Sequence, residues 1–201
     1  MNFPKKWIVL GAVVLLVFIL GGSCVHSYNK LNTLDQAVKG QWANVESAYQ
    51  HRLDELTRQV EIVKGAANFE KDTYVAVTNA RNQAQQVKLT ADDLSDPAKV
   101  KAFEAAQAAV GASLSKLMVV VEKYPDLKAT QNFSNLQGIL SGLENRINVE
   151  RSRFNDDARD FNTYRNSFPT TIAAGFFGSR FADKAYFTAT PAAANAPEIH
   201  F

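Results

Sequence analysis

The stretch VEKYPDLKATQNFSNLQGILSGLENRI, residues 121–147, has a helical pattern at both ends but a proline, a threonine and two asparagines in between. Pro125 disfavours helical geometry at Tyr124, and Asn132 or Ser134 offers a side-chain oxygen that can cap a following helix. The unpaired N–H and C=O groups of two helix ends need such polar partners. The stretch therefore predicts a corner where two helices fold back on each other. A binding or catalytic role for this corner is the alternative interpretation.

The helix after the corner has the clearest apolar pattern in the chain. Its apolar residues follow alternating three- and four-residue steps, as in bundles and coiled coils: Phe133, Leu136, Leu140, Leu143, Ile147, Phe154, Phe161, Tyr164 and Phe168. Glu150 and Asp157 fill the two seam positions that lack an apolar residue. We expect these acids to meet Arg81 or Arg146 or to reach water, rather than to act as paired carboxylates. Five seam residues are expected to be buried against the first and third helices, namely Leu140, Leu143, Ile147, Phe154 and Phe161.

Three further helical patterns precede the corner. The nearest is a seam over 100–124, broken only by Gln107, which follows Asp96-Pro97, a pair typical of an N-cap and a proline at the first helical position. A weaker small-residue stripe covers about 69–87 and a longer apolar stripe covers about 28–64, while 88–96 is polar and predicts a loop. No stretch alternates with a period of two for long enough to indicate a sheet. The sequence therefore predicts an all-α fold, an antiparallel bundle of about four long helices over residues 26–168.

The N-terminus predicts a membrane segment. Residues 1–6 form a short basic start with Lys5 and Lys6, and residues 7–25 carry no charge, a length that spans a bilayer core of about 30 Å. We predict an uncleaved, single-pass transmembrane anchor over 7–25. A lipoprotein signal modified at Cys24 is the alternative, although Gly21 stands where such signals usually carry an aliphatic residue, and an ordinary cleaved signal peptide is the third interpretation. The two lysines favour a soluble domain on the periplasmic or extracytoplasmic side of the cell membrane.

The C-terminal part is rich in aromatic residues. Those at and beyond the end of the seam are Phe168, Phe176, Phe177, Phe181, Tyr186 and Phe187. We expect residues 169–190 to fold back over the bundle and close its core. The alternative is an exposed aromatic patch for a partner or a lipid headgroup region. Residues 191–201, rich in alanine and proline, predict a flexible tail.

Composition and motifs offer little support for an enzyme or a nucleic-acid-binding protein. There are 22 basic and 20 acidic residues, and without Lys5 and Lys6 the remainder is formally neutral, so no basic footprint for nucleic acid is expected. His26, His51 and His200 are far apart and lack other ligands at metal-binding spacing. Cys24, the only cysteine, lies at the membrane without a histidine partner. The sequence therefore predicts no catalytic, metal-binding or cofactor-binding residues and no cofactor.

The ordered motifs of the chain together resemble the LemA family of membrane-anchored helical proteins from bacteria. The signature runs through the corner and the following helix as Tyr124-Pro-Asp-Leu-Lys-Ala129, Asn132-Phe133, Leu136-Gln137 and Glu144-Asn-Arg-Ile147. Further matches lie in order on both sides: Tyr28-Asn29, Trp42-Ala-Asn44, Val63-Lys64-Gly65, Ala80-Arg81, Phe168-Pro169, Phe177-Gly178 and Tyr186-Phe187. The resemblance covers about residues 28–187.

The resemblance implies a short N-terminal membrane segment, an elongated helical bundle and no established enzymatic activity. Some family members occur at specialised membranes such as the magnetosome. The chain departs from the family pattern in two places. Thr57 and Arg58 stand where a proline and an asparagine are usual, which removes a helix kink, and Phe69 stands where many members carry a histidine before Glu70. A ligand role for that histidine would not apply to this chain.

These observations predict a membrane-tethered, non-enzymatic structural or interaction protein that presents a helical bundle to a protein partner or to copies of itself. The alternative is a membrane-anchored protein that binds a lipid or a small apolar ligand in a groove of the bundle. A filled core would favour the first hypothesis. A large cavity lined by Leu143, Phe154 and Phe161 would favour the second.

Overall fold

The structure, a computed structural model, describes residues 5–66, 71–122 and 131–188. Its elements are the helices α1 (Lys5–Ala66), α2 (Lys71–Gln86), α3 (Pro97–Glu122), α5 (Gln131–Asn166) and α6 (Thr170–Phe176), with short 3-10 turns η1 (Asp93–Ser95) and η2 (Gly178–Phe181). The described residues contain no β-strand, which confirms the predicted all-α fold. The corner around Pro125 and the tail over 191–201 lie outside the described residues, so both remain predictions.

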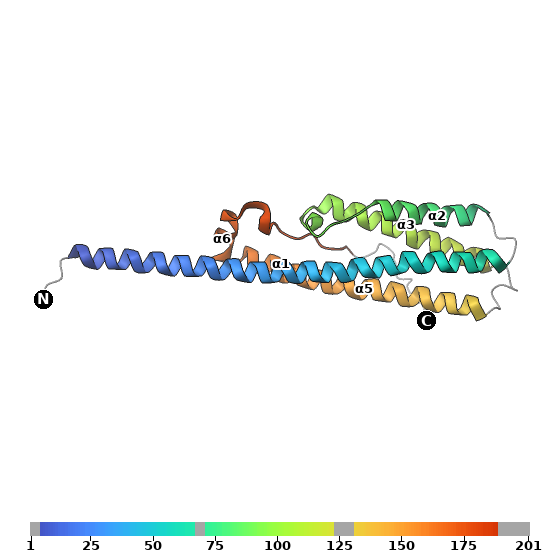
Figure 1. Cartoon of the computed structure of the whole chain (residues 1–201), viewed down its shortest axis with the longest axis horizontal. Helices are drawn as coiled ribbons and strands as arrows, with labels where there is room; N and C mark the ends of the chain where they lie inside the picture. Colours follow the sequence, from blue (N-terminus) through green and yellow to red (C-terminus); the bar gives the residue numbers. More distant parts are fainter. Residues whose placement is uncertain (1–4, 67–70, 123–130, 189–201) are drawn as a thin grey trace, which may run out of the picture.

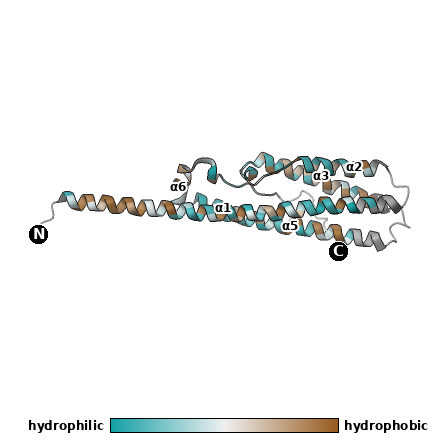
Figure 2. Ribbon diagram, in the orientation of Figure 1, coloured by the Kyte–Doolittle hydropathy of each residue, from teal (hydrophilic) through white to brown (hydrophobic). Residues whose placement is uncertain are grey.

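The four long helices form an antiparallel bundle in which successive helices run in opposite directions (Figure 1). α1 lies along α5 and α2 lies along α3, as the sequence predicts for helices that return at each end. α1 is a single helix of 62 residues. Its N-terminal part projects beyond the bundle alone, and Figure 2 shows that this projecting part is the most continuously hydrophobic segment of the molecule.

The start of α3 follows the local chemistry of its sequence. The Asp96 side chain accepts hydrogen bonds from the backbone N–H groups of Ala98 at 2.9 Å and Lys99 at 3.3 Å. Pro97 occupies the first helical position, where its missing N–H leaves no partner unsatisfied. The predicted N-cap is therefore confirmed.

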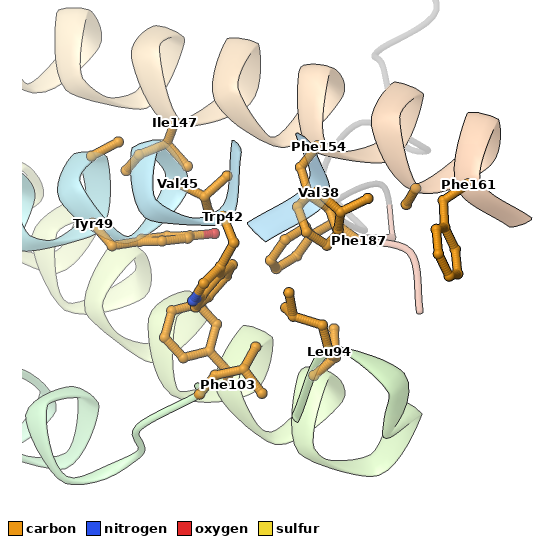
Figure 3. Close-up of a cluster of buried hydrophobic side chains, with 14 of the residues drawn as sticks. Val38, Trp42, Val45, Tyr49, Leu94, Phe103, Ile147, Phe154, Phe161 and Phe187 are labelled. Carbon is orange, nitrogen blue, oxygen red and sulfur yellow. The ribbon is translucent and has the colours of Figure 1, made fainter. Parts of the chain in front are cut away.

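The core consists of two apolar clusters arranged along the bundle. The cluster nearer the projecting end centres on aromatic residues of α1, α3, α5 and the C-terminal segment, and Figure 3 shows Trp42, Phe103, Phe154 and Phe187 converging there. Trp42 meets the Phe103 ring edge-to-face, with 5.5 Å between centroids, and stacks on Phe187 at 6.1 Å. The cluster at the other end contains smaller aliphatic residues: Leu53, Leu56, Val77, Ala80, Ala84, Val110, Leu114 and Leu117.

The seam of α5 is buried over only part of its length. Ile147, Phe154 and Phe161 are buried as expected, but Leu140 and Leu143 are only half-buried, so the prediction was wrong for these two leucines. The reason lies in helix spacing: α5 lies closely along α1, whereas α3 and α5 make few close backbone approaches. At the level of Leu140 and Leu143, the apolar seam of α5 therefore packs closely against α1 but not against α3. The side chains of Phe133 and Leu136 are not among those that the structure describes.

Candidate functional site

A groove of about 1080 Å³ lies where α3 and α5 stand apart. Small side chains line the α3 wall, including Ala105, Ala108, Gly111 and Ala112, and Ser141 lies on the α5 side. Leu114, Met118 and Leu140 make one end of the groove apolar. The groove can therefore receive an elongated group that approaches both helices closely.

A buried polar layer lines the groove and divides the two core clusters. Arg52 of α1 is only 4% exposed. Its guanidinium donates to the backbone oxygen of Gln107 at 2.8 Å, to the Gln107 side-chain oxygen at 2.7 Å and to Glu144 at 2.9 Å. It also lies over the Tyr49 ring, 5.2 Å from the centroid. Burial of Tyr49 raises the pKa of its hydroxyl. Through its hydrogen bonds, Arg52 connects α1, α3 and α5 at one level of the bundle.

An extended segment after η2 is fixed to α5 by two asparagines spaced seven residues apart. The Asn162 carboxamide donates to the Lys184 backbone oxygen at 2.9 Å and accepts from the Lys184 N–H at 2.8 Å. Asn155 makes the same pair of hydrogen bonds with the backbone of Phe187, at 2.9 and 2.8 Å. We call this segment, residues 182–188, the strap.

The strap brings buried charge and aromatic surface to the bundle. The Lys184 ammonium lies 2.7 Å from the Asp35 carboxylate of α1 and over the Phe161 ring, and both charged residues are buried. At the strap's end, Thr188 donates its backbone N–H to Glu104 of α3 at 2.9 Å, while Arg151 of α5 pairs with Glu104 at 2.8 Å. The strap therefore connects α3 to α5 at one end of the groove.

The aromatic C-terminal residues divide between the core and the surface. Phe181 and Phe187 are buried, and Phe177 packs against Tyr28 with ring centroids 5.0 Å apart. In contrast, Phe168 and Phe176 are 81% and 82% exposed. The turn between Phe177 and Phe181 uses Gly178, whose φ of 61° suits a residue without a side chain. Phe181 and Phe187 therefore close the core as expected, while a role of Phe168 and Phe176 in contacting a partner or a lipid headgroup region remains a prediction.

The two seam acids do not share a site with the arginines proposed as partners. Glu150 accepts from Gln41 at 2.7 Å and pairs with Arg153 at 3.3 Å, so Arg81 and Arg146 were the wrong partners for it. Asp157 has neither a hydrogen bond nor an ion pair within the described part of the chain. Burial raises its pKa, and the neighbouring charges of Asp160 and Asp156 raise it further.

The remaining candidates stay separate in space. His26 and His51 are exposed at different levels of α1, and Cys24 is half-buried on the same helix. His200 lies outside the described residues. Among the residues that were described, no group of three or more histidine, cysteine and acidic side chains could hold a metal ion.

Sequence reasoning did not identify Arg52, Asn155 or Asn162. The break at Gln107 in the α3 seam was a usable signal for Arg52, because a buried amide needs a hydrogen-bonding partner. The seven-residue spacing of the two asparagines places them on one helix face. However, nothing in the local sequence shows that an extended segment returns to that face.

An antiparallel bundle closed by a C-terminal strap, with a first helix whose N-terminal part is apolar, defines a class of elongated helical-bundle proteins. The LemA family model matches residues 41–201, and the chain belongs to the LemA family. Within the described residues, α1 is the one helix long and apolar enough to cross a membrane, by length and composition alone, which fits a single-pass membrane protein. A signal sequence near an N-terminus meets the same criteria.

The curated relatives include magnetosome proteins. The chain is 27% identical to magnetosome protein MamQ 2 of Paramagnetospirillum magneticum over 146 residues, 73% of this chain and 50% of the relative. It is 29% identical to magnetosome protein MamQ of Magnetospirillum gryphiswaldense over 99 residues, 49% of this chain and 36% of the relative. The chain thus spans half or less of the length of these relatives.

Proposed function

We propose that the protein is a membrane-tethered, non-enzymatic interaction protein whose α3–α5 groove receives a helical segment of a protein partner. The observation that carries this proposal is the continuity of α1, which extends without a break from the apolar projecting part into the core of the bundle. Such a helix holds the bundle at a fixed height above the bilayer. We place the bundle on the extracytoplasmic side because Lys5 and Lys6 precede the apolar segment.

The groove suits a helix because its walls combine small residues with charged residues of both signs. Ala105, Ala108 and Ala112 allow a helix backbone to approach closely. Lys101 and Arg151 supply positive charge beside the groove, and Glu104 and Glu144 supply negative charge. Charges of both signs along an interface fix the register and orientation of a bound segment more than its affinity.

The test is photo-crosslinking in cells from positions beside the groove. We expect a crosslinker at Ser141 to capture a defined protein, while a crosslinker at the exposed α1 residue Asn44, away from the groove, does not. Adding Ala112→Trp, which fills the groove, should abolish capture at Ser141. Capture that is equal at Ser141 and Asn44, or unaffected by Ala112→Trp, would contradict the proposal. Capture of the chain by itself would assign the groove to self-association.

Binding of a lipid or a small apolar ligand is the second candidate, and the apolar end of the groove favours it. Leu114, Met118 and Leu140 form this end, whereas Phe154 and Phe161 are fully buried and do not line the groove. Native mass spectrometry of the detergent-extracted chain checks this candidate. A bound lipid that is present in the wild type and lost in Ala112→Trp would support it over the protein partner.

A further inference from the structure

α6 and the residue two positions before it present an exposed apolar face. Ile172 and Phe176 lie one helical turn apart on α6 and are 56% and 82% exposed, and Phe168, two residues before the helix, is 81% exposed. The opposite side of α6 is buried through Thr170, Ala173 and Ala174. Large side chains that are this exposed on one side of an element, and small ones that are buried on the other, indicate a surface made for a second contact.

This face lies at the level where α1 leaves its apolar segment. α6 contacts α1, and Phe177, which directly follows α6, lies against Tyr28 with ring centroids 5.0 Å apart. Tyr28 is three residues beyond Val25, the last residue of the uncharged run, which is about 4.5 Å along a helix. Figure 1 shows α6 beside α1, at the end of the bundle from which the N-terminal part of α1 projects.

The height of α6 matches the headgroup layer of a bilayer. The polar layers add about 5–7 Å on each side of the hydrocarbon core, so a residue about 4.5 Å beyond the core lies among the headgroups. Arg180 is exposed and lies over the Tyr28 ring, 5.3 Å from the centroid. Lys30 is exposed two residues further along α1, and the chain has no acidic residue before Asp35. This end of the bundle therefore presents apolar side chains and positive charge together.

We propose that the face formed by Phe168, Ile172 and Phe176 inserts into the headgroup–acyl boundary of the same phospholipid bilayer that α1 crosses. The inference rests on the membrane tether of the proposed function. A helix alone leaves the bundle free to tilt and rotate about α1. A second contact at α6 fixes its tilt and its rotation, and hence the direction in which the α3–α5 groove faces.

The experiment uses the full chain in phosphatidylcholine–phosphatidylglycerol vesicles. An environment-sensitive NBD label is attached to Thr171→Cys, an exposed α6 position, in a Cys24→Ser background that removes the native thiol. Lipids with a nitroxide near the headgroup report contact by quenching. We expect several-fold stronger quenching at this position than at Ser152→Cys, an exposed position on α5 distant in sequence from α6.

A matched pair of surface variants separates insertion from mere proximity. Replacing Phe168, Ile172 and Phe176 together by serine should reduce quenching at position 171 to the level at position 152. Val149→Ser, which also removes an exposed apolar side chain of the bundle, should leave it unchanged. Quenching at position 171 that matches position 152 in the wild type, or that survives the triple substitution, would overturn the proposal.

Two further readouts distinguish the lipid contact from a failed tether and from self-association. Extraction of the chain by alkaline carbonate would show that the tether itself fails, whereas a retained chain without quenching would refute only the α6 contact. NBD shielding that rises with protein concentration in lipid-free detergent would assign the face to a second copy of the chain and would also overturn the lipid contact.

Discussion

At the scale of single residues, the strap depends on two side-chain amides that stand in for a neighbouring strand. A carboxamide offers one donor side and one acceptor side, which is the same pair of groups that a peptide unit presents. Asn155 and Asn162 each use both sides on a single residue of the strap. The strap backbone is thereby satisfied without a β-sheet.

The first prediction concerns Asn162. Asn162→Ala should lower the free energy of unfolding by about 1–3 kcal/mol, because the partly buried N–H and C=O of Lys184 lose their partners. Asn162→Asp should also destabilise, since it keeps an acceptor but loses the donor. Urea unfolding of the full chain in detergent micelles, followed by circular dichroism, measures both.

Asn148→Ala is the control, because Asn148 is exposed on the same helix and its removal should cost less than about 0.5 kcal/mol. Equal effects at Asn148 and Asn162 would mean that the asparagines do not hold the strap.

The second prediction concerns Asp157. Its pKa in the folded protein is above the ordinary value of 3.8, so the folded state favours the protonated carboxyl group. This preference stabilises the fold fully below pH 3.8, and the stabilisation is lost as the pH rises through the folded pKa. At pH 7 the ionised carboxylate is penalised by burial and by neighbouring acids. Asp157→Asn should therefore stabilise the protein at pH 7, by less than about 1 kcal/mol because the site is partly solvated.

The stability gained from Asp157→Asn should shrink below about pH 4, where Asp157 of the wild type is protonated in both the folded and the unfolded state. Paired urea titrations at pH 7 and pH 3 give the comparison. Asp54→Asn is the matched control, since Asp54 is exposed on α1 and is not among the charges that raise the pKa of Asp157. A gain of the same size for both variants, or one that is independent of pH, would contradict the prediction.

At the scale of elements, the polar layer at Arg52 fixes how α1, α3 and α5 align. Apolar seams with three- and four-residue spacing can slide by whole turns and still bury their side chains. A buried arginine whose partners lie on two other helices, at Gln107 and Glu144, forms these hydrogen bonds in only one alignment. The layer therefore contributes specificity of register more than stability.

The third prediction tests this layer. Arg52→Met should destabilise the bundle by about 1–3 kcal/mol, because the buried Gln107 side chain loses its donor. Adding Gln107→Leu should recover much of that loss, since the unpaired polar group is gone. Urea unfolding of the two single variants and the double variant gives the coupling energy. Strictly additive effects would show that the two residues are not energetically linked.

At the scale of the whole molecule, the functional surfaces lie at different heights along one long helix. The apolar part of α1 projects beyond the bundle (Figure 2), α6 lies at the junction, and the groove lies further along. In our proposals the apolar part of α1 crosses the bilayer and α6 contacts its surface, whereas the groove lies away from the bilayer. The orientation of the groove then depends on how firmly α1 and α6 are held.

The fourth prediction is that the mature protein keeps its N-terminus. It follows from the uncharged run over 7–25 and from Gly21 at a position unfavourable for lipoprotein processing. Intact-mass analysis of the protein purified from membranes shows whether the N-terminus is retained. A chain that begins at a lipid-modified Cys24 would replace the transmembrane anchor by a lipid anchor, and a chain that begins beyond it without lipid would indicate a cleaved signal peptide.

Much of the architecture was determined by local sequence. Helical spacing of apolar residues, the Asp96–Pro97 cap and the uncharged run over 7–25 were enough to predict an all-α antiparallel bundle with an apolar N-terminal helix. These features act over one or two helical turns, so their chemistry is visible in the order of residues. The buried positions Ile147, Phe154 and Phe161 followed from the same spacing.

Only the tertiary structure decided which faces of the helices meet. Leu140 and Leu143 continue the seam of α5 but are half-buried, because α3 stands away from α5 at that level and leaves the groove. The partners of Arg52 and of the two strap asparagines lie 22 to 92 residues away in sequence, and no periodic pattern specifies such pairings. The same holds for the aromatic segment, where packing against Tyr28 and Trp42 buries Phe181 and Phe187 and leaves Phe168 and Phe176 exposed. Residue spacing sets which side chains share a face, but the distance between helices decides whether that face is covered.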